Sequence, residues 1–165
     1  MMNFPILSSL ILLPSIGALF ILFIKSSSSN TYQASKYVAL FTSFANFLIS
    51  IYLWYLFDNS TYDFQFVEDK QWIKGFVNYK VGIDGISILF ILLTTLITPL
   101  CIISVNNSVT SRLKEFLIAI LIMESFMIGV FCSLDLVIFY LFFEGGLIPM
   151  FLIIGIWEGS RRVYS

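Results

Sequence analysis

Histidine is absent from this sequence, and cysteine occurs only twice, at Cys101 and Cys132. The two cysteines have no CxxC-like spacing, whereas metal, haem and iron–sulfur sites need clustered ligands of these types. A Gly-rich dinucleotide fingerprint is also missing. The sequence therefore predicts no metal or other cofactor bound by this chain, and no hydride or electron chemistry within it.

Charge is scarce as well. Charged residues are 12% of the 165 residues and hydrophobic residues are 59%, which leaves too little polar surface to cover a soluble globule. Such a composition is typical of a membrane protein. The segment Met1 to Pro5 has no basic residue, so it matches neither a secretory signal nor an Arg-rich transit peptide. An organellar protein with this start is expected to be made inside the organelle.

Five apolar runs are long enough to cross a hydrocarbon core of roughly 30 Å, which takes about 20 residues. Only a helix satisfies its own backbone in lipid, so each run predicts a transmembrane helix. The fourth and fifth runs merge, and their combined length places a tight turn at Ser133, the predicted N-cap of the fifth helix. The predicted helices lie near residues 4–24, 37–57, 86–105, 116–132 and 134–157.

One sizeable segment, residues 58–85, lies outside the apolar runs. Alternation at Tyr62 to Phe66, and in part at Phe76 to Val81, predicts two short strands folded as a hairpin. The predicted fold is an all-α integral membrane protein of about five transmembrane helices with one short extramembrane hairpin, forming a single membrane domain over residues 1–165.

The distribution of basic residues predicts the orientation, because short loops rich in Lys and Arg tend to stay on the inner side. The hairpin segment has fewer basic residues than the opposite face, so we expect the N-terminus outside and the C-terminal tail in the matrix or cytoplasm. The basic residues of the inner face are Lys25, Lys36, Arg112, Lys114, Arg161 and Arg162.

Two acids interrupt the apolar runs. Glu124 lies near the middle of the fourth predicted helix and Glu144 near the middle of the fifth, roughly 15 Å from either surface at about 1.5 Å per residue. A carboxylate at that depth costs at least about a few kcal/mol, so it should face protein or water and be paired. Every Lys and Arg maps to a loop or a helix end. Either these carboxyls are protonated, or their basic partner comes from another polypeptide.

The surroundings of Glu144 add two features. Gly145, with its neighbour Gly146, lets another helix approach closely. Pro149 cannot donate to the carbonyl of Gly145, which predicts a local break in the helix hydrogen bonding beside the acid. A protonated Glu144 that only bonds a neighbouring helix is the alternative to a proton-transfer role.

The other two acids near the helices have structural interpretations. Asp135 lies nine residues before Glu144, on the opposite face of a helix at about 100° per residue, and it would stabilise the helix dipole. Asp84 is predicted to be a turn or cap residue that opens the third helix.

Three stretches together resemble the subunit 4 family of NADH dehydrogenase, the antiporter-like membrane subunits of respiratory complex I. The third stretch is the most specific, because Glu144 is followed by Leu147-Ile148-Pro149-Met150 and Gly155-Ile156-Trp157. The three stretches are Val81 to Ser87 with Leu93-Thr94-Thr95, Glu124 to Phe131 with Leu134-Asp135-Leu136, and Phe143 to Trp157 with Arg161-Arg162-Val163-Tyr164.

By this resemblance, Glu144 corresponds to the fifth-helix glutamate that couples to a lysine on a broken seventh helix in a proton half-channel, and Glu124 to a secondary acid. The resemblance covers the whole chain but only the first part of the family's length. It therefore implies a split subunit whose remaining helices are on a second chain. A fragment of a longer protein would look the same.

The resemblance implies a proton-translocating subunit of NADH:ubiquinone oxidoreductase in the mitochondrial inner membrane, or in the plasma membrane of a bacterium. Its partners would be other membrane-arm subunits and lipids, and no nucleic acid. The alternatives are a subunit of a multisubunit sodium/proton antiporter or membrane-bound hydrogenase, and a scaffold fragment that conducts no protons.

Overall fold

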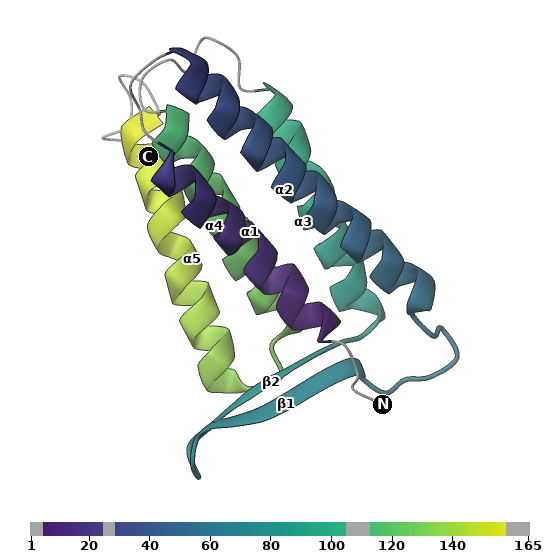
Figure 1. The fold of residues 1–165 in the computed structure, drawn as a ribbon. Helices are drawn as coiled ribbons and strands as arrows, with labels where there is room; N and C mark the ends of the chain where they lie inside the picture. The colour runs from purple at the N-terminus through teal and green to yellow at the C-terminus, as the bar shows by residue number, and fades with distance from the viewer. Residues whose placement is uncertain (1–4, 25–28, 105–112, 158–165) are drawn as a thin grey trace.

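The computed structural model describes residues 5–24, 29–104 and 113–157, which form five helices with a two-stranded hairpin at one end of the bundle (Figure 1). All five helices are long and apolar enough to cross a membrane, so the predicted fold class is confirmed. The predicted limits at residues 4 and 105, and the basic tail, lie outside the described residues. The helices are α1 (Ile6–Phe23), α2 (Ser29–Leu56), α3 (Gly85–Ser104), α4 (Leu113–Cys132) and α5 (Leu136–Trp157).

The second helix begins eight residues before its predicted start at residue 37. Hydropathy marks the part of a helix that can lie in hydrocarbon, and the apolar span of α2 is the shorter segment Gln33–Leu56. The polar residues before it continue the helix beyond the apolar run. The fifth helix starts at Leu136 rather than at 134.

Helix α4 occupies the centre of the bundle and α5 its edge. α4 packs against each of the other four helices, and 50% of its apolar span is buried. The corresponding share for α5 is 11%, because among the helices it packs mainly against α4 (Figure 1). Most of the α5 surface is therefore turned away from the described part of the chain.

The hairpin consists of antiparallel strands β1 (Gln65–Ile73) and β2 (Val77–Ile83), joined by a turn in which Gly75 has a φ of 76°. The predicted first strand, 62–66, is wrong in its limits. The ladder includes the charged run from Glu68 to Lys70, which a search for alternating apolar residues passes over. Backbone hydrogen bonds form this ladder, so charged side chains at its exposed positions do not interrupt it.

The hairpin is attached to the start of α1 through a charged cap. Pro5 provides no side-chain cap, and the carboxylate of Glu68 accepts hydrogen bonds from the Ser8 backbone N–H at 3.0 Å and from the Ser8 hydroxyl at 2.7 Å. The Tyr79 hydroxyl lies 2.9 Å from the same Ser8 oxygen, and burial raises the pKa of Tyr79. A negative charge at a helix N-terminus is stabilised by the free backbone N–H groups and by the helix dipole.

Glu68→Ala is expected to destabilise the detergent-solubilised protein by about 1–3 kcal/mol, because it removes a charged acceptor and leaves the Ser8 N–H without its partner. Thermal unfolding followed by circular dichroism would measure the loss. Asp69→Ala is the matched control, since Asp69 is the exposed neighbour on the same strand. Equal effects of the two substitutions would show that the Ser8 contact adds nothing.

The second strand also holds the turn between α4 and α5. The backbone N–H of Leu134 donates to the carbonyl of Lys80 at 2.9 Å, and Val81 forms an isolated bridge with Ser133. The hairpin therefore ties the start of α1 and the α4–α5 turn together at one end of the bundle (Figure 1).

Candidate functional site

Glu124 lies in the interior of the bundle, on the central helix α4. Its side chain is 1% exposed, and its neighbour across the helix interface, Asn46 of α2, is 0% exposed. The Asn46 Nδ2 donates to Glu124 Oε1 at 3.1 Å. The other oxygens of the pair, Glu124 Oε2 and Asn46 Oδ1, are buried without a hydrogen-bond partner among the described residues. The predicted acid is thus enclosed by protein and held by an amide that the sequence analysis did not identify.

Further polar pairs join the helices around this acid. The Ser15 hydroxyl of α1 donates to the hydroxyl of Ser125 at 2.8 Å, and the hydroxyls of Ser50 (α2) and Thr95 (α3) lie 2.8 Å apart. Interhelical hydrogen bonds of this kind stabilise helix packing in membranes, by about 0.6 kcal/mol on average. Together they form a largely buried polar layer in which α1, α2 and α3 each contact a neighbour through side-chain oxygens or nitrogens.

A groove of about 650 Å³ runs between α3 and α4 and reaches Glu124. The wall formed by α3 includes Thr94, Thr98 and Cys101, and the hydroxyls of the two threonines donate to carbonyls of their own helix at 2.9 Å. Their oxygens keep lone pairs for further hydrogen bonds. Glu124 therefore contacts Asn46 on one side and borders a mainly apolar groove on the other.

Glu144 has the opposite environment. It is exposed on the outer side of α5, among Leu141, Leu147 and Ile148. Its carboxylate makes no hydrogen bond or ion pair with any residue in the described ranges. The structure therefore does not bring the two predicted acids together, because Glu124 faces the bundle and Glu144 faces away from it.

Gly145 and Pro149 lie where α5 packs against α4. A Cβ placed on Gly145 would lie 3.0 Å from Phe126 of α4, so the predicted close approach of a neighbouring helix is present there. Pro149 is buried, and α5 continues through it to Trp157. Pro149 has no N–H to donate within the helix, as predicted beside Glu144. The helix itself does not end or divide at that point.

The two aspartates for which the sequence predicts structural roles, Asp84 and Asp135, both cap helices. Asp84 Oδ1 accepts from the Ser87 N–H at 2.8 Å at the start of α3, and this bond lowers the pKa of Asp84. Asp135 Oδ1 accepts from the N–H groups of Val137 and Ile138 at 2.9 and 3.2 Å, which makes Asp135 the N-cap of α5. The prediction that Ser133 caps this helix was wrong. The Ser133 hydroxyl instead donates to the Gly129 carbonyl, so α5 starts two residues later than predicted.

Comparison with known proteins gives a clear result for the sequence, although no family model matches the chain. The NADH-ubiquinone oxidoreductase chain 4 of Marchantia polymorpha is 51% identical over 157 residues, which are 94% of this chain and 31% of the relative. The NADH-quinone oxidoreductase subunit M of Rhodobacter capsulatus is 56% identical over 131 residues, 79% of this chain and 25% of the relative. The chain is homologous to part of NADH-ubiquinone oxidoreductase chain 4.

A solved structure also matches the chain in three dimensions. A chain of respiratory complex I from Thermus thermophilus with bound NADH superposes with a TM-score of 0.73 at 25% identity, over 96% of this chain and 30% of that one. The chain thus spans about a third or less of the length of the relatives it matches. The resemblance on which the sequence analysis relied is confirmed.

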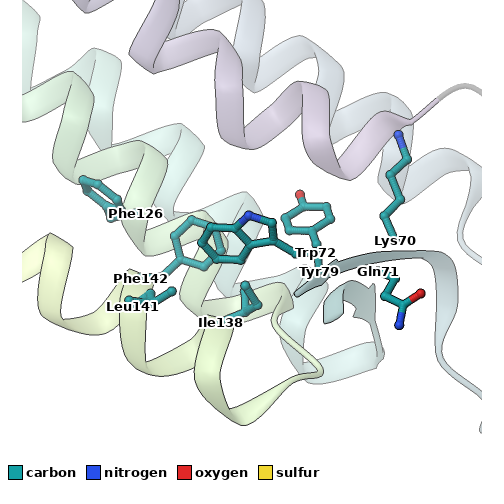
Figure 2. A pocket seen from close by; sticks show the side chains of 8 residues that line it. All are labelled: Lys70, Gln71, Trp72, Tyr79, Phe126, Ile138, Leu141 and Phe142. Carbon is teal, nitrogen blue, oxygen red and sulfur yellow. The ribbon is translucent and has the colours of Figure 1, made fainter. Parts of the chain in front are cut away.

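The chain also has a separate pocket of about 490 Å³ where the hairpin covers α4 and α5. Figure 2 shows the indole of Trp72 beside Tyr79 and Phe142, with Ile138 below it and Lys70 pointing away from the aromatic groups. No acidic side chain lines this pocket. It is therefore distinct from the positions of both candidate proton-transfer residues. Among the described residues, no group of three or more His, Cys, Asp or Glu side chains could hold a metal ion.

Asn46 is the residue that the sequence analysis missed. A pattern that would have found it is present in α2, where Ser43, Asn46 and Ser50 recur at helical spacing within an apolar helix and are all buried. Polar residues on one stripe of a membrane helix face other helices rather than lipid. The stripe predicts the polar contacts of α2, but not which acid Asn46 meets.

Proposed function

We propose that the chain is part of a membrane-arm subunit of a proton-translocating NADH:ubiquinone oxidoreductase, in which Glu144 accepts and releases protons and Glu124 acts as a second acid. The observation that carries the proposal is the exposed carboxyl of Glu144 in the middle of a membrane helix. An acidic side chain at the centre of a bilayer costs about 2.5–3.5 kcal/mol on insertion scales, so acids of this kind face protein or water and mark ion pathways.

Glu144 needs a partner from outside the described residues. The exposed side of α5 carries the acid, and no ion pair reaches it within those ranges. We propose that a lysine on further helices approaches this face, on a second chain as the sequence analysis expects. The ammonium would favour the charged form of the acid, and its withdrawal would favour proton uptake. NADH oxidation and quinone reduction would belong to other subunits of the enzyme.

We propose that the protein lies in the mitochondrial inner membrane, or in the plasma membrane of a bacterium. The hairpin and the start of α1 would lie on the outer side, and the end of α5 on the matrix or cytoplasmic side. This orientation follows from the smaller number of basic residues in the hairpin segment.

Mass spectrometry of the intact assembly purified through this chain tests the proposal. We expect NADH-oxidising and quinone-binding subunits in the same particle, together with a separate polypeptide that supplies the remaining helices. An assembly with neither redox subunit would instead indicate a multisubunit sodium/proton antiporter. A single longer polypeptide containing all the helices would contradict the second chain but not the enzyme.

A further inference from the structure

We infer that Glu124 carries a proton in the resting protein and donates it to Asn46 Oδ1, so that acid and amide form a closed pair in which Asn46 is the positioning residue. This inference deepens the proposed function, which requires Glu124 to exchange a proton. It concerns the resting state of one buried acid and can be tested without measuring pumping, so it can fail while the proposed function stands.

The hydrogen-bond inventory of the pair carries the first step. Asn46 Nδ2 already donates to Glu124 Oε1, and the two remaining oxygens, Glu124 Oε2 and Asn46 Oδ1, are both buried and both without a donor among the described residues. A carboxylate is only an acceptor, whereas a carboxylic acid has one O–H donor. A single proton on Oε2 would provide the donor that these two oxygens lack. A charged Glu124 would leave two buried acceptors unpaired, which is unfavourable.

The charges around the pair carry the second step. The described helices packed against α4 bring no charged side chain to Glu124: α1 has no ionisable group, and Cys101 is the single one in α3. The Lys36 of α2 is ten residues from Asn46, about 15 Å along a helix. On α5, Glu144 is turned outward. The described helices therefore place no cationic side chain beside Glu124 to compensate a negative charge.

The position of the pair explains why an amide suits this site. Asn46 belongs to α2, and the groove that reaches Glu124 is formed mainly by α3 and α4. The amide can therefore hold and orient the acid from the α2 side, while α3 and α4 enclose it on the groove side. An ammonium in the place of Asn46 would instead favour the charged form.

Isotope-edited infrared spectroscopy of the purified complex, with ¹³C-labelled glutamate, tests the inference at neutral pH. We expect a protonated-carboxyl band that disappears in Glu124→Gln. This variant should assemble normally, because a Gln amide offers the same donor and acceptor as the neutral acid. In Asn46→Leu the band should remain but move to higher frequency, because the carboxyl C=O no longer accepts the amide hydrogen bond.

Ser50→Ala is the matched control, since Ser50 lies on the same buried stripe of α2 and bonds Thr95 instead of Glu124. It should leave the band unmoved. If Asn46→Leu does not assemble, Asn46→Ser provides the same comparison with a smaller polar side chain. Loss of carboxylate bands in Glu124→Gln would overturn the inference and indicate a charged acid with a water molecule as donor. A protonated band that neither Asn46 variant shifts would overturn the role of Asn46.

Discussion

Glu144→Gln is expected to lower the proton pumping of the assembled enzyme by about tenfold or more, because an amide of the same shape cannot take up and release a proton at the working pH. Assembly should be unaffected, since Glu144 makes no contact with the described residues that the substitution could break. Proton pumping per NADH oxidised in sealed, coupled vesicles would measure the effect. The amount of assembled enzyme on a native gel would report on the structure.

Glu115→Gln is the matched control for this experiment. Glu115 is exposed in the first turn of α4, so the same change of charge takes place at the end of a membrane helix instead of its middle. It should leave pumping within about twofold of wild type, because an exposed residue at a helix end lies away from the buried contacts whose loss has large effects. Unchanged pumping in Glu144→Gln, with normal assembly, would favour the scaffold alternative for this part of the subunit.

The two intramembrane acids call for different partners. Glu124 is enclosed on α4 and already has an amide neighbour, whereas Glu144 stands on the least buried helix with no partner among the described residues. In the proposed mechanism, the first acid would hold a proton within the bundle and the second would respond to charges brought by other helices. A functional difference is thus expected from location alone, although both residues are glutamates at the middle of an apolar run.

Much of the fold could be predicted because the bilayer leaves few alternatives. Apolar runs of sufficient length must be helices in lipid, so the five helices followed from hydropathy. The cap of α3 by Asp84 followed in the same way from local turn chemistry. Where two runs merge, however, hydropathy has no minimum to mark the turn. The N-cap of α5 was therefore predicted to be Ser133, whereas the structure has Asp135 in that position.

The contacts between distant segments could not be predicted from the sequence. Ser8 and Glu68, or Asn46 and Glu124, are brought together by helix packing and by the position of the hairpin, and no local pattern encodes such a pairing. The exposure of Glu144 was also beyond prediction, because the apolar residues around α5 do not mark which side meets protein.

Gly129→Ala is expected to destabilise the packing of α4 against α5 by about 1–3 kcal/mol, because a Cβ at Gly129 would lie 2.6 Å from Cγ of Phe142 and one helix must shift. Thermal unfolding in detergent and the yield of assembled enzyme would measure this. Gly155→Ala is the matched control, since its Cβ would meet nothing within 4 Å. It should change stability by no more than about 0.5 kcal/mol.

A second substitution separates steric conflict from a general loss of helix packing. If the added methyl group of Gly129→Ala acts through the ring of Phe142, then Phe142→Leu should cost less in its presence than in the wild type, and the double variant should recover part of the lost stability. Additive losses would mean that the conflict is elsewhere. The outcome also bears on function, because contact with α4 positions α5, and α5 carries Glu144 towards the partner that the proposed mechanism requires.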